Sequence, residues 1–94
     1  MKDCTGAKMI AKKQIALCAD HAGRHPADTQ GTFTDLHMEL IELTTRFDKK
    51  PLEDTLKKLE LFNTRLPKTT SKPFRDNMKK AIALVVYAIN ECKI

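Results

Sequence analysis

The most constraining feature of this 94-residue chain is a helical repeat of large apolar residues in its middle third. Two consecutive segments carry leucine or phenylalanine at steps of three and four, which puts each series on one face of an α-helix. The first series is Phe33, Leu36, Leu40, Leu43 and Phe47, and the second is Leu52, Leu56, Leu59, Phe62 and Leu66. The connection, residues 48–50, is so short that helices over about 32–47 and 51–65 must form an antiparallel hairpin.

Two further helices are predicted on either side of this hairpin. Residues of about 6–22 carry a line of small apolar side chains at helical steps, and Gly23 and Pro26 should end that helix. The last helix should cover about 72–92, with Ser71 or Thr70 as its cap and Pro73 in its first turn. We therefore predict an all-α protein, a small antiparallel bundle of three or four helices in a single domain, residues 1–94. Within it, residues 1–30 form the N-terminal helix and linker, 31–66 the hairpin, and 67–94 the last helix.

The last helix divides into a basic beginning and an apolar end. Its end, AIALVVYAI at residues 81–89, is apolar on nearly every side. A helix of this kind is buried all round, so we expect it to be central in the bundle or to lie at an oligomer interface. A buried strand is the alternative, because valine and isoleucine favour strands. The length of the segment and the lack of a strand partner favour the helix.

Positive charge is concentrated at the two ends of the chain. The net charge is +5, made up of +2 in residues 1–30, −1 in 31–66 and +4 in 67–94. This asymmetry predicts an acidic partner, which could be nucleic acid, a phosphorylated ligand or an acidic protein face. A soluble protein with scattered lysines is the competing interpretation.

The strongest binding candidate is the basic stretch KTTSKPFRDNMKK, residues 68–80. Hydroxyl groups and cations near a helix N-terminus suit an anion, usually a phosphate. The candidate residues are Lys68, Thr70, Ser71, Lys72, Arg75, Lys79 and Lys80. The alternative is an ordinary helix cap with a solvated lysine face. Nucleic acid could bind there through phosphate contacts alone, because Phe74 is the single aromatic residue in the stretch.

A second candidate is a metal site in CADHAGRHPAD, residues 18–28. Cys18, His21 and His25 follow one another at three and four, so one helical face could present three zinc ligands. The competing interpretation is a helix C-terminus whose histidines lie near the negative end of the dipole. Gly23 and Pro26 favour this second interpretation, because they should end the helix before His25.

The sequence contains no Gly-rich phosphate loop, no HExxH motif and no nucleophile elbow. We therefore predict that the protein is not an enzyme and has no cofactor. An exposed patch of His37, Met38 and Ile41 is a further candidate for a partner surface.

Three cysteines, Cys4, Cys18 and Cys92, bear on the environment of the protein. Their odd number argues against a closed disulfide framework and for a reducing compartment. The first residues contain no uninterrupted apolar leader, and the longest apolar run is much shorter than the roughly 20 residues that cross a bilayer. These observations predict a cytoplasmic protein with no membrane association.

Together these features predict a small, non-enzymatic binding or regulatory protein. It should associate with a larger macromolecular partner, most simply a larger protein, modulate its activity, and form a homo-oligomer. Small basic helical proteins of this type are typical of phage- or plasmid-encoded inhibitors of host machinery, which is a further hypothesis. The alternative is a phosphate-directed binder of nucleic acid or a nucleotide through the basic start of the last helix.

Overall fold

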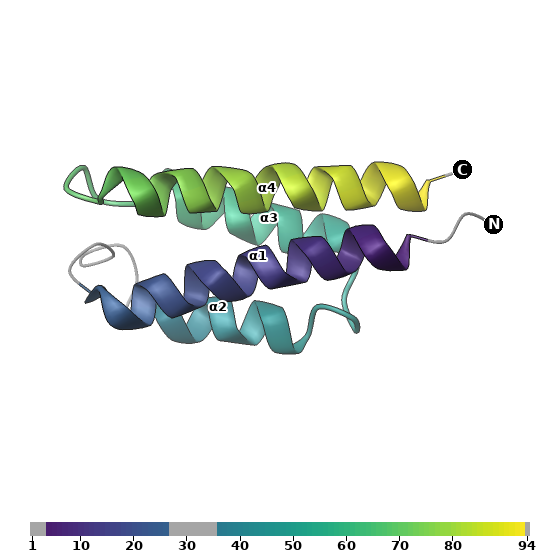
Figure 1. The fold of residues 1–94 in the computed structure, drawn as a ribbon, viewed down its shortest axis with the longest axis horizontal. Helices are drawn as coiled ribbons and strands as arrows, with labels where there is room; N and C mark the ends of the chain where they lie inside the picture. Colours follow the sequence, from purple (N-terminus) through teal and green to yellow (C-terminus); the bar gives the residue numbers. More distant parts are fainter. Residues whose placement is uncertain (1–3, 27–35, 94) are drawn as a thin grey trace.

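The computed structural model describes residues 4–26 and 36–93, which form four α-helices and no strand (Figure 1). The helices are α1 (Thr5–Arg24), α2 (Leu36–Thr45), α3 (Leu52–Thr64) and α4 (Lys72–Cys92). The all-α prediction is confirmed. Residues 81–89 lie within α4, so the alternative of a buried strand is wrong. The beginning of the predicted second helix, residues 32–35, lies outside the described residues.

The helices run alternately up and down, so both ends of the chain lie at the same end of the bundle (Figure 1). The main packing pairs are α1 with α4, α1 with α2, and α3 with α4. The predicted antiparallel hairpin of α2 and α3 is present, but its two helices do not pack chiefly on each other. Instead, α2 is held on α1 and α3 is held on α4.

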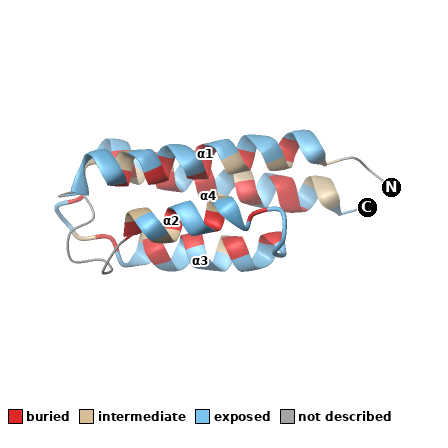
Figure 2. Ribbon diagram, turned by 90° about the horizontal axis from the view of Figure 1, so that it is seen from below, coloured by how far each residue is buried: buried red, intermediate tan, exposed pale blue. Residues whose placement is uncertain are grey.

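The core is formed by the predicted apolar stripes (Figure 2). In the hairpin, the buried residues include Leu36 and Leu40 of α2, Phe47 just after α2, and Leu59 and Phe62 of α3. In α1 the buried side consists mainly of small residues: Ala7, Ala11, Ile15, Cys18, Ala19 and Ala22. In α4 it consists of Phe74, Met78, Ala81, Val85, Ala88 and Ile89. Periodicity in the sequence therefore identified the buried faces of α1 and of the hairpin correctly.

Two helix ends show how local sequence and packing compete. At the start of α4, the Ser71 hydroxyl accepts a hydrogen bond from the backbone N–H of Phe74 at 3.5 Å, as the predicted cap requires. At the end of α1, the helix continues through Gly23 instead of stopping there. A Cβ atom on Gly23 would lie 2.7 Å from the ring of His37, so this glycine permits close contact between α1 and α2.

The expectation that α4 is buried on all sides is wrong for the isolated chain. Helix α4 packs chiefly against α1 and α3, and Val86 and Tyr87 are 39% and 48% exposed. Helix α4 is in fact amphipathic. Its sequence reads as uniformly apolar because some of its exposed positions, such as Ala83, carry alanine, which exposes little apolar area. The alternative place for α4, at an oligomer interface, stays a prediction.

A disulfide joins Cys4 to Cys92, with their Cα atoms 5.1 Å apart, and Cys18 is a buried free thiol. The prediction that the odd cysteine count argues against a disulfide framework is therefore wrong, whereas the reducing compartment stays a prediction. An odd count requires only that one cysteine be unpaired. The other two meet because an even number of antiparallel helices returns the chain to the end where it began.

We predict that replacing Cys4 and Cys92 by serine lowers the free energy of unfolding by about 4.5 kcal/mol. The bond closes a loop with a sequence separation of 88, and a loop of this length removes much of the entropy of the unfolded chain. Urea denaturation of the oxidised protein and the double variant measures the difference. Adding a reductant should destabilise the wild type and leave the double variant unchanged; equal stability of the two proteins would contradict the prediction.

Candidate functional site

The basic start of α4 forms only part of the predicted anion site. Lys72, Arg75 and Lys79 share one face of α4, as their spacing predicts, whereas Lys80 lies about 100° further round the helix. Lys68 lies in the turn before the helix. The four lysines are exposed, but Arg75 is half-buried.

Arg75 is used to hold the turn that leads into α4. Its Nε donates to the carbonyl oxygen of Thr70 at 3.3 Å, and its Nη2 donates to the carbonyl oxygen of Pro67 at 2.5 Å. The same turn is closed by a hydrogen bond from the Thr70 N–H to Pro67. Thr70 is buried and Ser71 caps the helix. Three of the seven predicted residues therefore support the backbone, and the remaining four are solvated lysines.

Replacing Arg75 by methionine should lower the free energy of unfolding by roughly 1–3 kcal/mol. The two partly buried carbonyl groups would lose charged donors while the aliphatic packing is largely kept. Lys72→Met is the matched control on the same helix face and should change stability by less than about 0.5 kcal/mol. Denaturant titration of both variants makes the comparison, and equal effects would show that Arg75 does not support the turn.

The metal candidates do not assemble into a site in the part of the chain that the structure describes. Residues 4–26 and 36–93 contain no group of three or more His, Cys, Asp or Glu side chains that could hold a metal ion. His21 and His25 do come together, with ring centroids 4.8 Å apart, but His21 also packs on Phe74 at 5.0 Å. Cys4 and Cys92, the other two cysteines, are joined to each other in a disulfide.

Cys18 is buried in the core, and this burial raises the pKa of its thiol from 9.0 to about 12. Metal binding and nucleophilic attack both require the thiolate, which this environment disfavours. The arrangement therefore supports the interpretation of Cys18 as a small core residue and gives no support to the predicted metal site.

In the folded protein at pH 8, we expect a thiol reagent to modify Cys18 far more slowly than in the unfolded chain. The shift in pKa lowers the thiolate fraction about 1,000-fold, and burial blocks access as well. Labelling with a chromogenic disulfide reagent, with and without guanidinium chloride, measures both rates. A Cys18→Ala variant should take up no label in either state, and fast labelling of the native wild type would refute a buried thiol.

The outward side of α1 is an exposed apolar surface that was not among the candidates from the sequence. Met9, Ile10 and Leu17 are 54%, 50% and 57% exposed, because the buried side of this helix is occupied by smaller residues. The signal was present in the sequence: α1 carries apolar residues on two different sides. Figure 2 shows the outward side of α1 exposed along the helix.

Helix α2 extends this exposed apolar surface on one side of α1. The His37 Nδ1 donates to the Ala19 carbonyl oxygen at 2.7 Å, and Lys12 pairs with Asp48 at 3.1 Å, which fixes the antiparallel register. Ile41 therefore lies alongside the middle of α1. Met38 and Ile41 are exposed, as the predicted patch requires, whereas His37 is half-buried and packs against α1.

Helix α4 extends the exposed apolar surface on the other side of α1. The Gln14 amide donates to the Asn77 carbonyl oxygen, and the disulfide joins the other ends of α1 and α4. In this register Tyr87 lies at the level of the first turns of α1. We name the combined patch the α1 surface: Met9, Ile10, Leu17, Met38, Ile41 and Tyr87.

Two lysines interrupt the α1 surface. Lys13 lies between Met9 and Leu17 at steps of four, and Lys80 lies two turns before Tyr87 on the same side of α4. Both are exposed, and neither forms an ion pair with a carboxylate of the described residues. The carboxylate on the same side of α1, Asp20, is paired with Arg24 at 3.1 Å. The α1 surface is therefore apolar with a positive local charge.

Comparisons of this chain with known protein families, with curated proteins and with solved structures find no match. In residues 4–26 and 36–93, no helix combines the length and the apolar character needed to cross a membrane.

Proposed function

We propose that the protein is a non-enzymatic binding protein that docks through the α1 surface onto a larger protein and modulates the activity of that partner. The observation that carries the proposal is the exposure of Met9, Ile10 and Leu17 on one side of one helix. Single exposed apolar residues are ordinary on a protein surface. Several exposed apolar residues on three neighbouring helices are more typical of an interaction site.

The charge on the α1 surface selects the chemistry of the partner. Lys13 and Lys80 would be desolvated without compensation by a purely apolar partner, so the partner should present carboxylates around an apolar contact. A second copy of this chain fits less well. Two copies meeting through this surface would bring four of these lysines together, and each chain carries a net charge of +5. The predicted homo-oligomer is thus an outcome that the experiment below must distinguish.

Phosphate-directed binding of nucleic acid or a nucleotide at the start of α4 is the competing function. It is weakened by the use of Arg75, Thr70 and Ser71 within the turn. Four exposed lysines remain for phosphate contacts: Lys68, Lys72, Lys79 and Lys80. Binding of this kind falls steeply with salt concentration. The contact proposed here is mainly apolar with only two lysines, so its affinity should fall less with salt.

The finer role as an inhibitor encoded by a phage or plasmid, and the cytoplasmic location, belong to this proposal as hypotheses. The Cys4–Cys92 disulfide weakens the hypothesis of a cytoplasmic location, because disulfides persist mainly in oxidising compartments. Trapping the thiols with an alkylating reagent during cell lysis would show whether Cys4 and Cys92 are oxidised in the cell.

A photo-reactive amino acid at position 17 should form an adduct with the partner in the cells that naturally produce the protein. The same residue at position 61 is the matched control, because Leu61 is 44% exposed but lies on α3, away from the α1 surface. The affinity of the purified partner should then fall at least about tenfold with Leu17→Asp and change little with Leu61→Asp. An acidic contact region on the partner is the further expected result.

Three results would overturn this proposal. The first is an adduct with a second copy of the chain, which would assign the α1 surface to self-association. The second is equal loss of binding in the two aspartate variants. The third is binding that disappears with salt and with Lys72→Glu, which would assign the function to the basic start of α4.

A further inference from the structure

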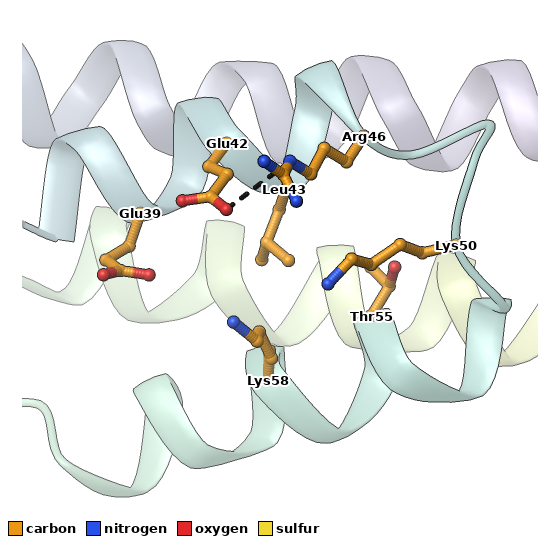
Figure 3. Close-up of a pocket in the computed structure, with 7 residues that line it drawn as sticks. All are labelled: Glu39, Glu42, Leu43, Arg46, Lys50, Thr55 and Lys58. Carbon is orange, nitrogen blue, oxygen red and sulfur yellow. Dashed lines mark ion pairs between the residues drawn. The ribbon is translucent and has the colours of Figure 1, made fainter.

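A groove between α2 and α3 combines buried and charged groups that the proposed function does not use (Figure 3). It exists because α2 packs chiefly on α1 and α3 chiefly on α4, so the side chains of the hairpin do not fill the space between them. The hollow drawn in Figure 3 has a volume of only about 10 Å³, roughly the space of one water molecule. A second hollow of about 240 Å³ adjoins it towards α3, and the two share Leu43, Lys50, Thr55 and Lys58. Leu43 provides an apolar wall.

The most unusual group in the groove is the hydroxyl of Thr55. Thr55 is 2% exposed, yet its hydroxyl has no hydrogen-bond partner among residues 4–26 and 36–93. The side chains of Thr44, Thr45 and Thr64 each donate to a carbonyl oxygen four residues earlier, whereas at Thr55 only the backbone N–H bonds to Pro51. In Figure 3 the Thr55 oxygen points into the space between α2 and α3. A buried hydroxyl of this kind is expected to bond a group in the groove.

Two ammonium groups point into the same space. Lys50, from the connection, and Lys58, from α3, reach towards the groove from different sides (Figure 3). Neither forms an ion pair with a carboxylate of the described residues. Two like charges directed at one space repel each other, and an anion between them would convert that repulsion into attraction.

The remaining charged residues of the groove, three carboxylates and two cations, carry a net charge of −1. Arg46 pairs with Glu42 at 3.6 Å, and Glu39 lies towards the beginning of α2, on the far side of Glu42 from Lys50 (Figure 3). Near α3, Asp54 and Lys57 add one charge of each sign. With Lys50 and Lys58 included, four cations face three carboxylates, so the groove has a net charge of +1. We name the part lined by Lys50, Thr55 and Lys58 the corner of the groove.

We propose that this corner binds a small phosphate anion, either inorganic phosphate or the phosphoryl group of a monoester. Thr55 donates its hydroxyl hydrogen to one phosphate oxygen, and Lys50 and Lys58 neutralise the charge on the others. Leu43 limits access from the side of α2. This site is separate from the α1 surface and from the basic start of α4, and it does not depend on the proposed function.

Titration of inorganic phosphate, and separately of O-phosphoserine, tests the site. The amide resonances of Lys50, Thr55 and Lys58 are followed by NMR at constant ionic strength, with chloride as the competing salt. Both ligands should shift these resonances saturably if the phosphoryl group is the recognised element. Saturation by inorganic phosphate alone would identify the free anion as the ligand, and saturation by the monoester alone would identify a phosphorylated partner.

Variants assign the binding to particular atoms. Thr55→Val should weaken binding at least about fivefold, because one hydrogen bond to a charged acceptor is lost, and Thr55→Ser should retain it. Lys50→Gln and Lys58→Gln should each weaken it as well, whereas Lys72→Gln, at the start of α4, is the matched control and should not. Thermal melts confirm that each variant is folded.

The proposal is overturned if wild-type resonances in the groove do not saturate, or if Thr55→Val binds as tightly as the wild type. It is also overturned if the shifts map to residues 68–80 and disappear with Lys72→Gln. That result would support the competing function at the start of α4. Failure at the groove alone leaves the α1 surface untouched, so the two proposals can be judged separately.

Discussion

The close packing of α1 against both α2 and α4 is the interaction on which the rest of the structure depends. It is possible because α1 turns alanines towards its neighbours and reserves only Ile15 as a large aliphatic side chain in the core. Small side chains allow backbones to approach closely. At Gly23, the His37 ring lies so near the backbone that even a Cβ atom would clash with it. The consequence is that the large apolar residues of α1 lie outside. The exposed apolar surface of α1 and its core of small side chains therefore have the same origin.

The same packing explains the groove between α2 and α3. In a bundle where consecutive helices pair, the hairpin would close on its own apolar stripes. Here the stripes of α2 and α3 are buried against different partners, and the two helices are joined mainly by the short connection. The disulfide adds a covalent link to the α1–α4 pair, which already contains the Gln14–Asn77 hydrogen bond. The central pair is therefore reinforced, while the outer hairpin is left with space between its helices.

Local patterns in the sequence were sufficient to predict the helices, the buried stripes of the hairpin and the Ser71 cap, because each depends on residues within one or two turns. Features that depend on distant residues were missed. Gly23 looks like a helix stop until His37 is placed beside it, and Arg75 looks like a free cation until the carbonyl groups of the turn are oriented towards it. The pairing of Cys4 with Cys92 follows only from the number and direction of the helices.

The α1 surface and the groove lie on different edges of α2, and this separation has a physical basis. Ile41 and Met38 face solvent beside α1, whereas Glu39, Leu43 and Arg46 face α3, so one short helix contributes to both sites through different side chains. Helix α2 is fixed between them by the burial of Leu36, Leu40 and Phe47 and by the hydrogen bond from His37. Because exposed side chains on opposite edges of a well-packed helix share no contacts, substitutions at one site should act additively with substitutions at the other. Any coupling between ligands at the two sites would then have to come from movement of α2 as a unit.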